Sequence, residues 1–281
     1  MQSADLNLTT IVTGHQRFLF VKLPAGDADA GLADAIGRLG EGMENMHYAD
    51  GPPSAEAFRR GRFQILKAEP GLSREQDLSH PAVMDADGLI RLEAEDAEPL
   101  LEYEEGLRAL LNPAGGSVET LSGVQRPRSY TSHAMTQYAY TRAQQPGPGS
   151  VHPFGVVTPM NKNAEWWDMD WMHRESFFLP RYDAKENMVA KGHALAADAG
   201  IACITRRLVH APEGYGPSAS SGEGNYDFVG YFEFAEADAS TFSAVMAALR
   251  DTEQNPEWAY VSEGPEWWGR RVGEPAELWT A

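Results

Sequence analysis

Apolar residues recur along the first half of the chain at the two spacings that distinguish helices from strands. Four of them fall at i, i+4, i+7 and i+11 and predict a core-facing helix that Asp27 is placed to cap: Leu32, Ile36, Leu39 and Met43. Strands are predicted for LNLTTIVTG and QRFLFVKL within residues 1–23, and for a short segment from Phe63 to Leu66. The stretch SYTSHAMTQYAYTR, residues 129–142, has a β-rich composition and is expected to complete this sheet.

The second half shows a clearer alternation of the same patterns. Strands are predicted for FGVVTP, for IACITRRLVH (residues 201–210), for YDFVGYFEF (residues 226–234) and near Tyr260. Helical spacing predicts a helix from about Asn187 to Ala199 and another that presents Phe242, Val245, Met246 and Leu249 to the core. This order of elements is β-α-β-β-α-β, the ferredoxin-like arrangement.

The first half shows a weaker version of that order, so the fold class is predicted to be α+β. We expect two tandem ferredoxin-like halves that pack into an α+β barrel. The segment AQQPGPGS, residues 143–150, is the clearest linker in the sequence. We therefore place the boundary between the halves there, with residues 1–148 as a cofactor-free half and residues 149–281 as the half that carries the chemistry.

Charge and composition narrow the classes of function. The 281 residues carry a formal net charge of −18, which argues against nucleic acid or an anionic membrane as a partner. The single cysteine, Cys203, excludes an internal disulfide framework and a cysteine-based metal cluster. No apolar run reaches the length of a membrane span, and the N-terminus lacks the pattern of a signal peptide, so a cytoplasmic location is expected.

Two residues of the second half carry candidate chemistry. His193 shares its predicted helix face with Val189, Ala196 and Ala197, and small neighbours would let a flat macrocycle approach a neutral imidazole. A histidine that only packs and bonds a carbonyl is the alternative. Arg206 falls on the apolar side of its strand, where a guanidinium needs an anion or a paired acceptor. A bound anionic substrate would satisfy it, and so would a salt bridge to one of the many acids.

Several segments of the second half, taken together and in this order, resemble the haem-binding domain of the chlorite dismutase family, which also contains the coprohaem decarboxylases. The matching segments are TPMNKNAEWW, the helix with His193, RRLVH, YDFVGYFEF, TFSAVMAALRDTE and GPEWWGRR. The interval from His193 to the end of the next strand, His210, also matches without a gap.

The resemblance implies roles for individual residues. It implies haem b with His193 as the axial iron ligand, and Arg206 as the distal arginine that acts on the substrate. Lys162 and Trp166 fall at haem-edge and pocket positions, and Trp167 is the aromatic residue beside them. Glu253 is expected to accept the imidazole N–H; a one-residue shift would give that role to Gln254.

The resemblance also implies a reaction and an assembly. Coprohaem decarboxylases carry a tyrosine where this chain has Thr158, which together with Arg206 points towards chlorite dismutation. In that reaction chlorite becomes chloride and dioxygen through an iron-oxo species and hypochlorite. A homo-oligomer is expected, with a pentamer favoured by the chain length.

Two insertions, at about residues 168–186 and 214–225, depart from the family pattern and leave other functions open. These are another haem enzyme on this fold (a peroxidase, or a lyase acting on an organic or aromatic substrate), a haem carrier or sensor, and a cofactor-free barrel acting through His173 or Tyr182.

Overall fold

The structure is a computed structural model that describes residues 14–26, 30–48, 54–127, 132–140, 152–211 and 226–280. Several predicted features lie outside these residues: the strand LNLTTIVTG except its last residue, the cap at Asp27, the linker 143–150 with the boundary between residues 148 and 149, and the insertion at 214–225. No helix within the described ranges is long and apolar enough to cross a membrane.

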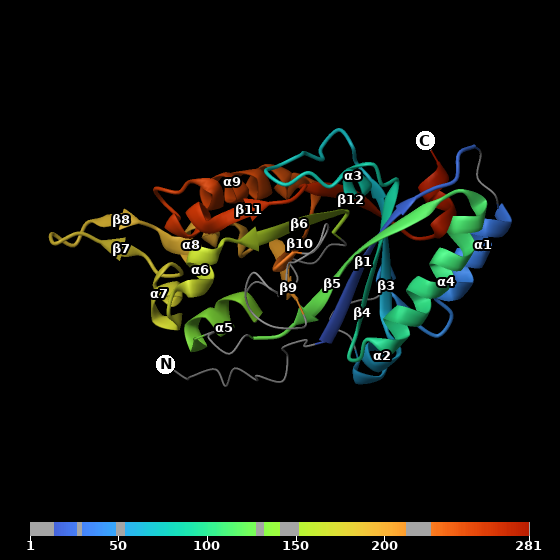
Figure 1. Ribbon diagram of the computed structural model, residues 1–281, viewed down its shortest axis with the longest axis horizontal. Helices are drawn as coiled ribbons and strands as arrows, with labels where there is room; N and C mark the ends of the chain where they lie inside the picture. Colours follow the sequence, from blue (N-terminus) through green and yellow to red (C-terminus); the bar gives the residue numbers. More distant parts are fainter. Residues whose placement is uncertain are drawn as a thin grey trace.

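The first half of the chain contains four long strands and two long helices (Figure 1). Its elements are β1 (Gly14–Lys22), α1 (Ala30–Leu39), β2 (Glu44–Asn45), α2 (Ala55–Arg60), β3 (Arg62–Ala68), α3 (Pro81–Met84), β4 (Gly88–Ala94), α4 (Glu98–Ala114), β5 (Ser117–Gln125) and α5 (His133–Tyr140).

The second half repeats four long strands, but its first crossover is broken into short pieces. Its strands are β6 (Phe154–Lys162), β7 (Arg181–Tyr182), β8 (Met188–Ala190), β9 (Ile204–His210), β10 (Phe228–Phe234), β11 (Val261–Glu263) and β12 (Trp267–Val272). Its helices are α6 (Ala164–Asp168), α7 (Trp171–Ser176), α8 (Gly192–Ala196) and α9 (Ala239–Arg250), with short 3-10 turns that include η3 (Asp198–Gly200), η6 (Pro256–Tyr260) and η7 (Pro275–Trp279).

Eight strands form a closed antiparallel ring. Within the halves the strand orders are β5-β1-β4-β3 and β12-β6-β10-β9, the same ferredoxin-like order twice. The ring closes through two seams: β3 pairs with β12 over four residue pairs, and β5 pairs with β9 at Val124 and His210. The prediction of two ferredoxin-like halves in an α+β barrel is therefore confirmed.

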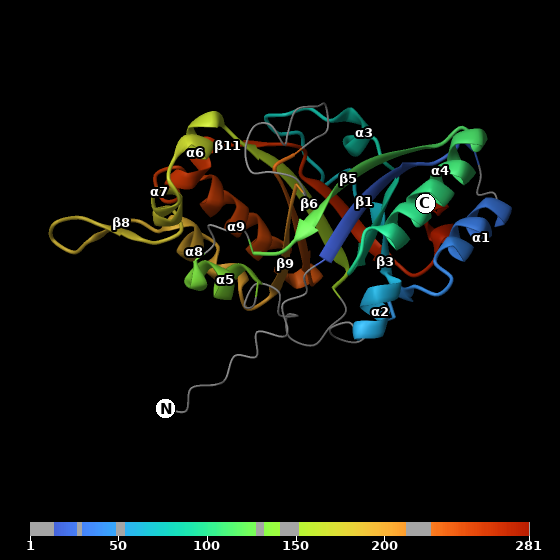
Figure 2. The ribbon, with the colours of Figure 1, turned by 60° about the horizontal axis from the view of Figure 1, so that its bottom comes forward.

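Side chains alternate between the barrel interior and its outer faces. Residues of both halves fill the interior, among them Phe18, Leu89, Val209 and Trp267. Helices α1 and α4 cover the outer face of the first half, and α9 covers that of the second half (Figure 2). In β9, Ile204 and Leu208 belong to the outer cluster. Arg206 lies between them and so points outward, as predicted.

The structure corrects four sequence predictions of secondary structure. Tyr260, near which the final strand was predicted, ends the 3-10 turn η6, and the last long strand is β12. Residues 133–140 form helix α5 rather than a strand, and the Ser132 hydroxyl accepts from Met135 N–H as a helix cap does. The helix predicted from Asn187 begins only at Gly192, because residues 188–190 form β8. Val189 is consequently 54% exposed and shares no face with His193. The predicted strand 201–210 begins at Ile204.

Candidate functional site

Helix α8 holds the site together, and its first turn is anchored by two other segments. The N–H of His193 donates to the Phe177 carbonyl at 3.1 Å, and that of Gly192 donates to the Gln254 carbonyl at 3.0 Å. Gly192 has φ +65°, and a Cβ there would lie 2.3 Å from the Leu179 carbonyl oxygen. Any larger residue would collide with the Leu179 carbonyl, so the backbone conformation at the start of α8 requires glycine at position 192.

Two charged side chains, Glu257 and Lys162, form a row behind the imidazole. His193 Nδ1 lies 2.9 Å from Glu257 Oε2, and Lys162 Nζ donates to Glu257 Oε1 at 2.7 Å. Lys162 also lies over the Trp166 ring, 4.0 Å from its centroid. Lys162 comes from the end of β6 and Glu257 from η6, so three separate segments meet at this carboxylate.

The charges in this row fix its protonation. Burial opposes ionisation of Glu257, but Lys162 and His193 outweigh it and hold the pKa of Glu257 well below its ordinary value. Burial lowers the pKa of His193, and Arg206 and Lys162 lower it further against the opposing effect of Glu257. An ionised carboxylate can only accept, so the neutral imidazole carries its proton on Nδ1 and leaves the Nε2 lone pair free.

That lone pair points at Arg206. Arg206 Nη1 lies 3.1 Å from His193 Nε2, and because a guanidinium can only donate, Nε2 is the acceptor. Among the described residues no carboxylate forms an ion pair with Arg206, and its Nε has no hydrogen-bond partner. The two predicted key residues are thus brought together, and the arginine faces a neutral ring rather than an acid.

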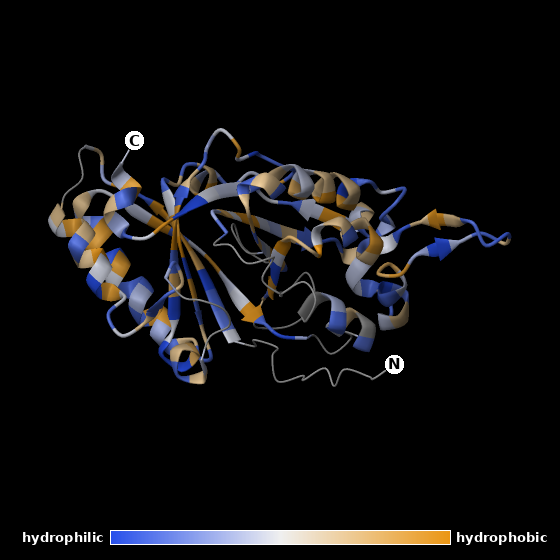
Figure 3. Ribbon diagram, turned by 180° about the vertical axis from the view of Figure 1, so that it is seen from behind, coloured by the Kyte–Doolittle hydropathy of each residue, from blue (hydrophilic) through white to orange (hydrophobic). Residues whose placement is uncertain are grey.

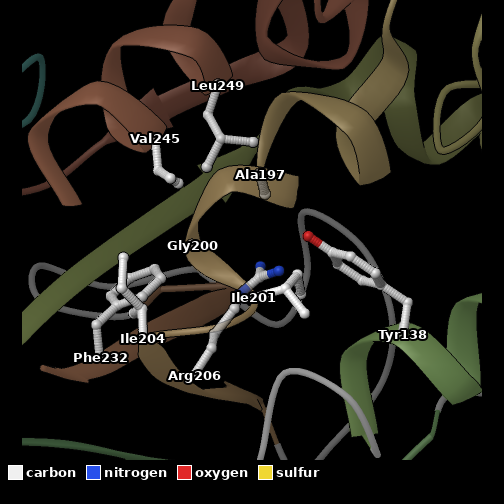
Figure 4. Close-up of a pocket in the computed structure, with 9 residues that line it drawn as sticks. All are labelled: Tyr138, Ala197, Gly200, Ile201, Ile204, Arg206, Phe232, Val245 and Leu249. Atoms are coloured by element: carbon white, nitrogen blue, oxygen red, sulfur yellow. The ribbon is translucent and has the colours of Figure 1, made fainter. Parts of the chain in front are cut away.

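A small pocket lies beside this contact (Figure 4). Its space is about 20 Å³, and its walls come from β9, β10, α9, η3 and α5: Tyr138, Ala197, Gly200, Ile201, Ile204, Arg206, Phe232, Val245 and Leu249. In Figure 4 the Arg206 guanidinium and the hydroxyl end of Tyr138 point towards each other across the pocket. Apart from Arg206 and Tyr138 the walls are apolar.

The two predicted tryptophans have different surroundings. Trp166 is buried and packs between Phe177 and Tyr260, with ring centroids 5.6 and 5.9 Å away. Trp167 stacks on Phe228 at 6.1 Å, and its Nε1 donates to an Asp227 carboxylate oxygen. Neither tryptophan lines the 20 Å³ pocket; Trp166 lies with Lys162 behind the imidazole.

The prediction that Glu253 accepts the His193 imidazole N–H is wrong. Glu253 is exposed. It lies in a turn in which its N–H and that of Gln254 donate to the Asp251 carboxylate. The acceptor is Glu257, which follows that turn and lies just after Pro256 in η6. The segment NPEW was a usable signal, since proline followed by glutamate is typical of a helical first turn.

Tyr138 is the pocket residue that the sequence did not reveal. Its ring centroid lies 6.4 Å from that of His193, edge to face, and 5.3 Å from that of Phe178. Because its segment was read as a strand closing the first half, nothing indicated that it would cross to the other half. The ring is 7% exposed.

No protein-family model matches the sequence. Solved structures are similar over almost the full length. A tryptophan-to-valine variant of chlorite dismutase from Candidatus Nitrospira defluvii has a TM-score of 0.63 and 17% identity, with 98% of each chain covered. The enzyme from that organism in complex with imidazole has a TM-score of 0.62 and 18% identity, over 95% of this chain and 94% of that chain.

A tryptophan-to-phenylalanine variant in complex with cyanide has a TM-score of 0.61 and 17% identity, over 94% of this chain and 92% of that chain. The agreement extends across both halves, and it matches the strand order established above. This chain has the fold of the chlorite dismutases.

Proposed function

We propose that this chain is a haem b oxidoreductase that converts chlorite to chloride and dioxygen. One observation carries the proposal: Arg206 projects from an apolar sheet face towards His193 Nε2, with no carboxylate paired to it among the described residues. A partly buried guanidinium in such surroundings calls for an anion. The fold shared with chlorite dismutases makes chlorite the anion to test first.

The donor set fits haem. A neutral imidazole whose Nδ1–H is bonded to a carboxylate could hold iron through Nε2, and such a hydrogen bond would raise the basicity of that ligand. The buried polar atoms of this half that lack a hydrogen-bond partner among the described residues include Arg206 Nε and Thr158 Oγ1, which lies on the same outer sheet face as Arg206. His193 would hold the iron, and Arg206 and Thr158 would lie on the sheet side of the pocket.

The space fits haem only after a rearrangement. A volume of about 20 Å³ holds roughly one water molecule, far less than a porphyrin requires. The guanidinium that contacts Nε2 is the end of a flexible side chain, and Tyr138 lines the pocket beside it. Haem binding at Nε2 therefore requires Arg206 to leave that atom and the pocket walls, Tyr138 among them, to move apart.

When bound, haem would supply the redox chemistry that cleaves the Cl–O bonds of chlorite. The protein's own groups have separate tasks. Glu257, held ionised by Lys162, keeps the proton on His193 Nδ1 and fixes the ring orientation. The apolar walls, including Ile204 and Val245, exclude water and strengthen electrostatic interactions inside the pocket.

Arg206 supplies the positive charge. Once its guanidinium has left His193 Nε2, Arg206 would bind the anion as it enters and retain charged chlorine species until dioxygen has formed, which is electrostatic stabilisation. The balance of the reaction is one chlorite in, one chloride and one dioxygen out, so no external reductant is required. The resemblance to chlorite dismutases also leads us to propose a homo-oligomer, with a pentamer as the form to test first.

The experiment is an absorption spectrum of the haem-loaded protein, followed by an oxygen-electrode trace on addition of chlorite. Wild type should show a Soret band and release oxygen. His193→Ala should lose the axial ligand and the wild-type spectrum. His173→Ala is the matched control, because this exposed imidazole should be dispensable. An unaltered spectrum in His193→Ala would refute the ligand, whereas a normal spectrum without oxygen release would leave haem binding and remove chlorite as the substrate.

A further inference from the structure

The chain from Leu179 to Lys191 forms an arm that projects from the body of the molecule (Figures 1 and 2). It contains β7 and β8, which pair only with each other and form a sheet separate from the barrel. Its tip is fixed by Asp183, whose carboxylate accepts the N–H groups of Lys185 and Asn187. The tip is thus a defined turn rather than a loose loop.

Large apolar side chains are exposed on and beside the arm. Seven of the ten exposed large hydrophobic residues of the described chain lie between residues 171 and 195: Trp171, Met172, Leu179, Tyr182, Met188, Val189 and Leu195. Figure 3 shows hydrophobic colouring along β8 where it leaves the body. A two-stranded hairpin is marginal in water, and apolar patches of this kind mark interaction surfaces.

The arm also differs in charge from the rest of the protein. Residues 179–191 contain three basic side chains against two acidic ones, in a chain with a net charge of −18. The Asp183 carboxylate accepts the hydrogen bonds of the turn. The arm therefore offers apolar surface with an excess of one positive charge, and it suits a partner surface that is apolar and acidic.

Such a surface exists at the other end of the molecule. An open groove of about 680 Å³ lies between the end of α1, α2 and the start of α4. Four acids line it against two arginines, Arg59 and Arg60, and Arg60 already pairs with Glu56 at 3.7 Å. The acids are Glu41, Asp96, Glu98 and Glu102, and the apolar lining includes Leu39 and Met43.

The arm and this acidic groove cannot meet within one copy, since they lie at opposite ends of the long axis (Figures 1 and 2). We propose that the arm of one copy docks in the acidic groove of a second copy. Tyr182 and Met188 would cover Leu39 and Met43, and Lys185 would face Glu102. The contact is head to tail, because each copy contributes a different surface at each end. It does not depend on haem.

Disulfide trapping tests the proposal directly. In a Cys203→Ser background, which removes the only native thiol, one preparation carries Lys185→Cys and another Glu102→Cys. Oxidation of the mixture should give a linked dimer that neither preparation forms alone. Leu72→Cys replaces Glu102→Cys in the matched control, because Leu72 is 39% exposed and is not among the residues that line the groove. Linkage of Lys185→Cys to itself, equal linkage to Leu72→Cys, or no linkage would overturn the proposal.

A charge swap gives a second readout that needs no new thiol. Lys185→Glu and Glu102→Lys should each lower the mass measured by analytical ultracentrifugation, and the double variant should recover the wild-type mass. Both positions are on the surface, so circular dichroism should be unchanged. Full assembly in both single variants would contradict the docking, as would a double variant no better than the singles.

Discussion

The two halves share one strand order but use their outer faces differently. In the first half α1 and α4, of ten and seventeen residues, cover the sheet with a continuous apolar layer that includes Ile65, Leu92 and Leu107. In the second half the first crossover is broken, and the five-residue α8 stands where a long helix would otherwise lie. Because α8 is short, the outer sheet face of the second half carries polar contacts between His193, Glu257 and Arg206, where the first half has an apolar layer.

Each half places an arginine on its outer sheet face, and the partners differ. Arg17 of β1 forms an ion pair with Glu104, which also accepts from Arg108 and Thr120. Arg206 of β9 meets the neutral ring of His193 instead. The first arginine is satisfied by a carboxylate within the fold, whereas no carboxylate among the described residues pairs with the second. Under the proposed function, the absence of that one carboxylate is what makes Arg206 available to an anion.

The first prediction tests the apolar packing of the first half by creating a cavity in it. Leu107→Ala should lower the free energy of unfolding by about 2–5 kcal/mol, because Leu107 is fully buried between α4 and the sheet. Leu101→Ala, on the same helix but 40% exposed, is the control and should cost far less. Chemical denaturation measures both. Equal losses would show that the first half is not packed as described.

The second prediction tests the arginine by making the outer face of β9 apolar, like that of β3 in the first half. Arg206→Leu should retain haem and lower chlorite turnover by about 100- to 1,000-fold, the range expected when one preorganised donor is lost. Arg206→Lys keeps the charge and should retain part of the activity. The readout is initial oxygen release at fixed haem content. Wild-type turnover in Arg206→Leu would remove the arginine from the mechanism.

The third addresses the interior that both halves share. Burial opposes ionisation of Glu233, but Arg271, Arg91 and Arg207 lower its pKa from 4.5 to about 2. The unfolded chain therefore takes up a proton at higher pH than the folded one. The stability due to this group is complete above pH 4.5 and is lost as the pH falls towards 2.

This loss amounts to about 3 kcal/mol. Denaturant unfolding at a series of pH values between 7 and 2 should show this loss of stability. Each curve should have a single transition, because the interaction of Glu233 with Arg91 joins the second half to the first. Glu233→Gln should flatten this part of the pH profile. A profile unchanged in the variant would mean that other carboxylates govern acid unfolding.

The smallest effect is expected from the carboxylates behind the two arginine sites. Glu257→Gln should weaken haem affinity roughly 10- to 100-fold, because the hydrogen bond to His193 Nδ1 loses its charge. Glu104→Gln, in the first half, should leave haem affinity unchanged. Titration with haem, followed by absorption, compares them. A similar loss in both would point to general destabilisation.

Much of the barrel could be predicted from the sequence, because its strands alternate and its helices are periodic. His193 and Arg206 were found as residue types that needed an explanation on an apolar face. Their contact could not be derived, since it depends on how α8 and β9 pack. Glu257 was missed by four residues because the turn closed by Asp251 separates it from α9.

Tyr138 and the arm show a second limit. Local composition favoured a strand around Tyr138, and tertiary packing against Phe178 and His193 accompanies a helix there instead. The arm was noticed only as an insertion of unknown shape. Helical spacing extended the predicted helix into residues 188–190, where β8 pairs with β7. Pairing between neighbouring segments is information that spacing along one segment does not contain.

The unequal seams of the ring have a mechanical consequence. The β3–β12 seam is four residue pairs wide, whereas β5 and β9 meet at a single pair, Val124 and His210. The ring is therefore held firmly at the β3–β12 seam and weakly at the β5–β9 seam. The strand at the weak seam is β9, which bears Arg206. Amide protons of β9 should accordingly exchange faster than those of β3.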